Sequence, residues 1–133
     1  MSILLAISCS LQEDGQMVLR SCAKDGYYNF DVNFQDGARY RTAIVARYDA
    51  QQMPQGLVEM DIMLTSPDGD KYIDRVDFHI GEADGKIRDI KWPYRENVVL
   101  SGGQSGLWRV SIRPVDADVA PAISAMGFTY ETY

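Results

Sequence analysis

The sequence has 133 residues, of which 46% are hydrophobic and 24% are charged, and its formal net charge at pH 7 is −6. A chain of this length and composition can bury a core of its own, so it is predicted to be globular rather than disordered. The acidic balance and the lack of any basic run argue against nucleic acid and against an anionic membrane surface, because both require patches of Lys and Arg. Two cysteines and one histidine are too few for a disulfide scaffold or a histidine-rich metal site.

The chain begins with a short apolar run that ends in small residues just before Cys9. This pattern is typical of the cleavage box of a bacterial lipoprotein signal, so residues 1–26 are predicted to be a signal remnant followed by a polar arm, with Cys9 lipidated. The run lacks a basic start and is shorter than usual, which a late start codon or a trimmed chain would explain. The alternative is a first strand with Cys9 buried. A disulfide between Cys9 and Cys22 would exclude acylation of Cys9, and a lone Cys22 is favoured.

Regular alternation of apolar and polar residues begins at residue 27. The clearest case covers residues 58–65 and ends at Ser66-Pro67-Asp68-Gly69, a turn signal that predicts an antiparallel return over Lys71–Ile80. Residues 81–95 are predicted to be a long connection with at most a short strand at 87–90. Other strands are expected near residues 17–19, 28–34, 39–49, 97–100, 108–113 and 126–130. The pattern predicts one all-β domain at residues 27–133, an antiparallel and jelly-roll-like β-sandwich of seven or eight strands.

Several short motifs follow one another along residues 27–133. They are Phe30-Asp31-Val32, Arg39-Tyr40, Thr65-Ser66-Pro67-Asp68-Gly69 with Asp74 following, Arg95-Glu96-Asn97-Val98, Ser105-Gly106-Leu107-Trp108 and Ile123-Ser124-Ala125-Met126-Gly127-Phe128. In this order and spacing the region resembles the gliding-motility lipoproteins of the GldH family, except that a smaller aromatic is expected at Trp108.

The resemblance implies a noncatalytic lipoprotein of the bacterial cell envelope, facing the periplasm or the outer surface and anchored to the membrane through Cys9. Its implied partners are envelope proteins of the gliding-motility and linked secretion apparatus. It implies no cofactor and brings no catalytic residues. Because relatives also occur in bacteria that do not glide, the motility role is the least transferable part of the expectation.

Trp92 and Tyr94 form the densest aromatic cluster in a predicted loop, where large apolar side chains are uncommon without a partner. Such rings can stack on sugars, so a carbohydrate-binding sandwich is the first alternative function. The competing interpretation is that both residues cap an open end of the sandwich. Trp108 shares a strand face with Val110 and Ile112 and is predicted to belong to the core.

Catalytic and metal sites are weakly indicated. Ser105 lacks the glycine spacing of a nucleophile elbow, and a catalytic triad would depend on His79 alone, at a predicted outward strand position. Asp68 and Asp70 are weak candidates for a Ca²⁺ site, but Asp-Gly-Asp is also an ordinary turn with solvated charges. A hydrolase that uses two carboxylates is the second alternative function, although no pair of acids is singled out.

Overall fold

The computed structural model describes residues 17–81 and 86–133. In this part of the chain the strands are β1 (Met17–Leu19), β2 (Tyr28–Phe34), β3 (Arg39–Asp49), β4 (Gly56–Thr65), β5 (Lys71–Ile80), β6 (Ile87–Pro93), β7 (Val98–Val99), β8 (Gly106–Pro114) and β9 (Ile123–Thr132). Three short 3₁₀ helices are η1 (Arg20–Cys22), η2 (Gly102–Gln104) and η3 (Ala120–Ala122). No helix among these residues is long and apolar enough to cross a membrane.

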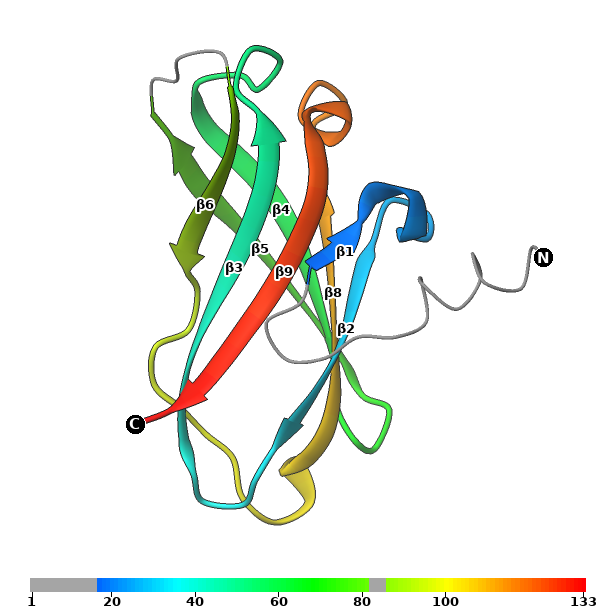
Figure 1. Cartoon of the computed structure of the whole chain (residues 1–133). Helices are drawn as coiled ribbons and strands as arrows, with labels where there is room; N and C mark the ends of the chain where they lie inside the picture. The colour runs from blue at the N-terminus through cyan, green and yellow to red at the C-terminus, as the bar shows by residue number, and fades with distance from the viewer. Residues whose placement is uncertain (1–16, 82–85) are drawn as a thin grey trace, which may run out of the picture.

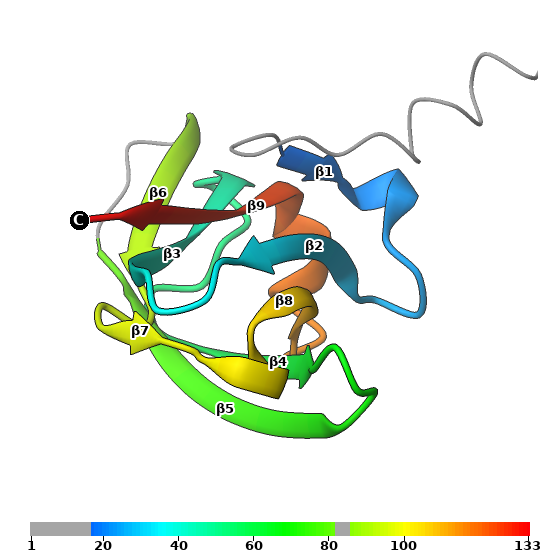
Figure 2. The same ribbon diagram turned by 90° about the horizontal axis from the view of Figure 1, so that it is seen from below.

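The strands form two antiparallel sheets packed face to face, which confirms the predicted β-sandwich (Figure 1). One sheet has the order β1-β9-β3-β6, with β7 also paired to β3, and the other has the order β2-β8-β4-β5. The chain changes sheet at most connections, which makes the topology jelly-roll-like, and Figure 2 shows the two layers from below. Eight of the described strands lie within residues 27–133, in agreement with the seven or eight expected there, and the three-residue strand β1 precedes them.

The predicted central hairpin is confirmed. β4 and β5 pair without a register shift from Gly56↔Ile80 to Thr65↔Lys71. Their tight turn depends on Gly69, whose φ of +90° is easy only for glycine, and on the Ser66 hydroxyl, which accepts a hydrogen bond from the Asp70 N–H at 3.0 Å. Because apolar and polar residues alternate along both strands, one apolar face of each strand packs into the core.

The core lies between the two sheets. Its fully buried side chains come from both layers and include Val32, Ile44, Val58, Met60, Ile62, Ile80, Val110, Ile112, Ile123 and Met126. Trp108 is 8% exposed and its indole N–H donates to the Gln104 carbonyl at 2.7 Å, so its predicted place in the core is confirmed. Burial of these side chains supplies the main driving force for folding.

The N-terminal region differs from expectation at Cys22. Cys22 is disulfide-bonded, so the prediction of a lone Cys22 is wrong. Cys9 is the only other cysteine in the sequence and lies outside the described residues, so its lipidation stays a prediction. β1 pairs with β9 from Met17↔Gly127 to Leu19↔Ala125, and the first sheet thus includes residues that precede position 27.

Candidate functional site

The two sheets meet along a side that we call the seam, where the edge strands β5 and β6 face each other. Trp92 closes one part of it. Its ring stacks on Phe78 with centroids 4.8 Å apart and planes 14° apart, and its Nε1–H donates to the His79 carbonyl at 3.2 Å. Trp92 belongs to β6 rather than to a loop and is only 5% exposed. The predicted loop position of Trp92 is therefore wrong, and its ring packs against Phe78 instead of facing solvent.

Tyr94 closes the next part of the seam. Its hydroxyl donates to Asp74 Oδ2 at 2.6 Å, and Arg95 Nη2 donates to the same oxygen at 3.1 Å. Burial, followed by the hydrogen bond with Asp74, raises the pKa of Tyr94 to about 12. The segment after β6 is thus tied to β5 by a neutral phenol and a cation that share one carboxylate.

Beyond this tie the seam opens into a cleft of about 650 Å³. Its floor is the buried aromatic set Phe34, Trp108 and Phe128, and its walls are Leu64, Val98 and Leu100. Its rim includes Tyr72, Tyr94, Glu96, Val99 and Gln104. A hollow of this size with an apolar lining and a few polar groups is typical of a binding site.

Tyr72 is the aromatic residue that the sequence analysis missed as a candidate. Alternation along β5 places it on the inward face, yet it is 46% exposed because it lies at the open end of the seam. Its ring centroid is 6.2 Å from that of Trp108. Among the predicted binding residues, only Tyr94 lies at the cleft together with Tyr72. The signal for Tyr72 was its position next to the Asp-Gly turn, where a strand leaves the core.

Carboxylates gather near the rim. Glu96 lines the cleft, and Asp68 Oδ2 lies beside η2, 3.9 Å from the position that a Cβ would take on Gly103. Within the described residues, Asp68 and Glu96 form no ion pair with Lys or Arg. Arg95, by contrast, is already paired with Asp74. The rim therefore carries negative charge that the fold does not neutralise locally, with Lys71 as the nearby cation along the chain.

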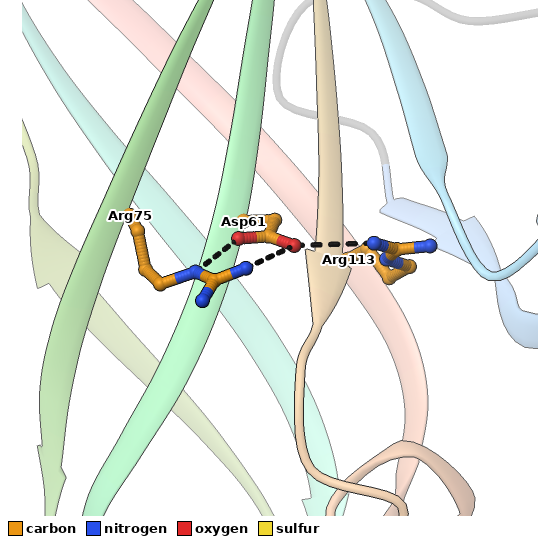
Figure 3. A network of polar contacts seen from close by, with 3 residues as sticks. All are labelled: Asp61, Arg75 and Arg113. Atoms are coloured by element: carbon orange, nitrogen blue, oxygen red, sulfur yellow. Dashed lines mark hydrogen bonds and ion pairs between the residues drawn. The ribbon is translucent and has the colours of Figure 1, made fainter.

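The outer face of the second sheet holds a separate polar network (Figure 3). Asp61 of β4 accepts two hydrogen bonds from Arg75 of β5, from Nε at 2.6 Å and from Nη2 at 3.2 Å, and one from Arg113 Nη2 of β8 at 3.1 Å. The two guanidinium groups leave the Asp61 side chain only 7% exposed and hold the pKa of its carboxyl below the ordinary value, chiefly through the bond from Arg75. Asp61 lies directly opposite Arg75 in β5 and Arg113 in β8, so the network links three neighbouring strands. We regard its role as structural.

The remaining candidates do not converge. No cluster of His, Cys, Asp or Glu suited to a metal ion occurs in the described residues, and Asp68 and Asp70 belong to no such group. His79 is exposed, in the outward position that alternation predicted. Ser105 donates its hydroxyl hydrogen to the Gly102 carbonyl at 2.7 Å, within the turn that includes η2.

The chain was compared with known proteins. No protein-family model matches it, and no curated protein gives a significant match. The resemblance to the gliding-motility lipoproteins thus stays a prediction.

Proposed function

We propose that this protein is a noncatalytic binding domain of the bacterial cell envelope, which acts through contacts with other envelope proteins. The observation that carries the proposal is the cleft, an apolar site that the seam-closing side chains Trp92 and Tyr94 leave open. The resemblance to the gliding-motility lipoproteins supplies the envelope setting and the gliding and secretion machinery as partners. A disulfide at Cys22 favours an oxidising compartment outside the cytoplasm.

The noncatalytic part of the proposal is supported by what the carboxylates do. Asp61, Asp74 and Asp89 each accept hydrogen bonds from an arginine, at distances between 2.6 and 3.1 Å. A carboxylate whose oxygen already accepts a hydrogen bond from a guanidinium group is poorly placed to exchange a proton with a substrate. These side chains stabilise the fold and leave binding to the cleft.

Membrane attachment through Cys9 competes with the disulfide at Cys22, because Cys9 is the only other cysteine in the sequence, and it is the part of the proposal most easily tested. An acylated Cys9 cannot form a disulfide, so the mass of the protein isolated from its native envelope under non-reducing conditions separates the two states. Cleavage before Cys9 with added acyl chains would establish the lipid anchor. An unacylated chain that loses its disulfide on reduction would refute the anchor and leave a protein held only by its partners.

The protein contacts require their own test. Chemical cross-linking in intact envelopes, followed by mass spectrometry, should link the chain to envelope proteins through residues near the cleft. Cross-links that are absent, or that fall only on the Asp61 face, would contradict the proposal.

Carbohydrate binding is the second candidate, and the half-exposed ring of Tyr72 beside Trp108 favours it. The platform would be Tyr72 rather than the buried Trp92. Glycan-array binding that disappears in Tyr72→Ala, with the thermal transition retained, would support this function in place of protein contacts. The hydrolase hypothesis rests on no grouping of acids and is not pursued.

A further inference from the structure

We propose that the cleft and the adjacent free edge of β5 form one docking site for an extended segment of a partner protein. The segment adds as a strand beside β5 and places a large apolar side chain in the cleft, with Lys or Arg next to it. This inference rests on the proposed function, because it names the way in which the protein would contact its partners.

The backbone of β5 supplies the first argument. β5 is the last strand of its sheet and pairs with β4 alone among the described strands. The His79 carbonyl accepts the Trp92 N–H, so it points away from β4. The backbone N–H and C=O groups of successive residues in a strand point to opposite edges, and β5 pairs with β4 without a register shift. The N–H and C=O of Ile73, six residues before His79, therefore also point away from β4. An outward row of backbone groups is what strand addition requires.

The seam itself supplies the second argument, because it shows which groups fit between these sheets. Trp92 combines a ring inserted against Phe78 with a hydrogen bond to the β5 edge. Tyr94 follows, with its hydroxyl on Asp74. At the next inward position of β5, Tyr72 has no such cover and the cleft begins. A large partner side chain inserted beside Tyr72, as Trp92 is inserted beside Phe78, would cover this position and close the seam there.

The chemistry of the lining favours a peptide over a sugar. Leu64, Val98 and Leu100 are aliphatic and form the walls, whereas stacking on a sugar ring uses exposed aromatic faces, of which the cleft presents only Tyr72. Ile73, beside Tyr72, is 73% exposed on the outer face of the same edge. It would be covered by the alternate side chains of an added strand.

The negative charge at the rim of the cleft indicates which residues the partner segment carries beside its apolar side chain. Asp68 and Glu96 have no Lys or Arg partner in residues 17–81 and 86–133, and the whole chain has a net charge of −6. Basic residues on both sides of the apolar anchor would neutralise these carboxylates and speed association. The partner segment is therefore apolar at one position and basic at its flanks.

The test begins with a phage-displayed library of linear peptides selected on the full chain. We expect enrichment of peptides in which a Trp, Tyr, Phe or Leu is flanked by Lys or Arg. One enriched peptide is then synthesised, and its affinity is measured by fluorescence anisotropy at two salt concentrations. Binding should weaken as salt rises, because the rim charges are exposed.

Two variants of β5 separate edge pairing from side-chain contact. Ile73→Pro removes an outward N–H that does not bond to β4, so the variant should keep the fold. Its affinity for the peptide should fall by about tenfold, the loss expected for one hydrogen bond. Ile73→Ala is the matched control, because it shortens the same side chain but keeps the N–H, and its loss should be much smaller. Tyr72→Ala should also weaken binding of the peptide. Leu57→Ala, an exposed apolar residue elsewhere on the sheet, should not.

If Ile73→Pro fails to fold, a peptide N-methylated at alternate residues tests the same hydrogen bonds on the unaltered protein and should bind more weakly than its parent. Lack of enrichment, or an affinity in both Ile73→Pro and Tyr72→Ala that equals that of the parent protein, would overturn the inference. Binding of a glycan at Tyr72 in place of any peptide would also overturn it. Envelope cross-links that persist in Ile73→Pro would overturn the docking mode alone and leave the proposed function intact.

Discussion

Trp92 and Phe78 stack face to face across the two sheets, with their ring centroids 4.8 Å apart and their planes 14° apart. Trp92 comes from β6 of one sheet and Phe78 from β5 of the other. These edge strands share no backbone ladder, so the stack and the indole hydrogen bond to His79 hold this part of the seam together. The strength of the seam thus depends on side chains.

Replacing Trp92 by Ala should destabilise the fold by about 3–5 kcal/mol, the usual cost of removing a buried large aromatic. Trp92→Phe should cost much less, because it keeps a ring on Phe78 and loses mainly the hydrogen bond to His79, which is worth about 1 kcal/mol. Urea unfolding followed by fluorescence measures both values. A cost below about 1 kcal/mol for Trp92→Ala would show that the stack contributes little and that Trp92 is free for other roles.

Trp108→Ala should be similarly costly, about 3–5 kcal/mol, because Trp108 is buried on the floor of the cleft and fixes the Gln104 carbonyl. The variant would also enlarge the cleft, so an apolar dye should bind it more strongly than it binds the parent. A chemical denaturation change below about 1 kcal/mol would remove Trp108 from the core. Tyr72→Ala serves as the control, since Tyr72 is half-exposed and should cost less.

The strands could be predicted from the sequence because each carries its own period. Residues 58–65 alternate strictly and end at Asp68-Gly69, so β4, its turn and β5 follow from local rules. β6 was predicted too short, because Trp92 and Pro93 resemble loop residues. Pro93 is tolerated there at the end of an edge strand.

The cleft could not be predicted from the sequence, because it depends on which edges meet. No local pattern places Tyr94 against Asp74, twenty residues earlier in the chain, or leaves Tyr72 uncovered. Asp61 shows the same limit. Alternation correctly places it on the outer face, but only the sheet order brings Arg75 and Arg113 to its two sides and buries it.

Asp61 should make stability depend on acidic pH. Its pKa is lowered in the fold, chiefly by the hydrogen bond from Arg75, while the unfolded chain has the ordinary value near 3.9. Below that ordinary value the unfolded state binds more protons, so stability falls as pH falls through the folded pKa and is fully present above about pH 5. Asp61→Asn should cost about 1–3 kcal/mol at neutral pH and should make the acid loss shallower.

Asp31→Asn is the matched control for Asp61→Asn. Asp31 also pairs with an arginine, Arg109, at 3.2 Å, but its side chain is 53% exposed. Such surface pairs contribute little, so its removal should change stability by less than about 1 kcal/mol. Urea unfolding from neutral to acidic pH measures both variants. Equal effects of the two substitutions would contradict a special role for the buried carboxylate.

Tyr94 should produce the opposite dependence at alkaline pH. Its pKa is raised to about 12, first by burial and then by the hydrogen bond with Asp74. An unfolded tyrosine ionises near 10, so between these values the folded state holds the extra proton. Stability is therefore fully present below about pH 10 and is lost as pH rises toward 12. An alkaline titration of tyrosinate absorbance should show this late ionisation.

Two variants assign that late step. Tyr94→Phe should remove one phenol from the late ionisation, to which Tyr28 also contributes because burial raises its pKa, and should flatten the alkaline loss of stability. Asp74→Asn should keep the step but move it to lower pH, since burial still raises the pKa of Tyr94 while the nearby negative charge is gone. A late step that survives unchanged in Tyr94→Phe would mean that another phenol is responsible and that the tie across the seam is looser than the 2.6 Å contact indicates.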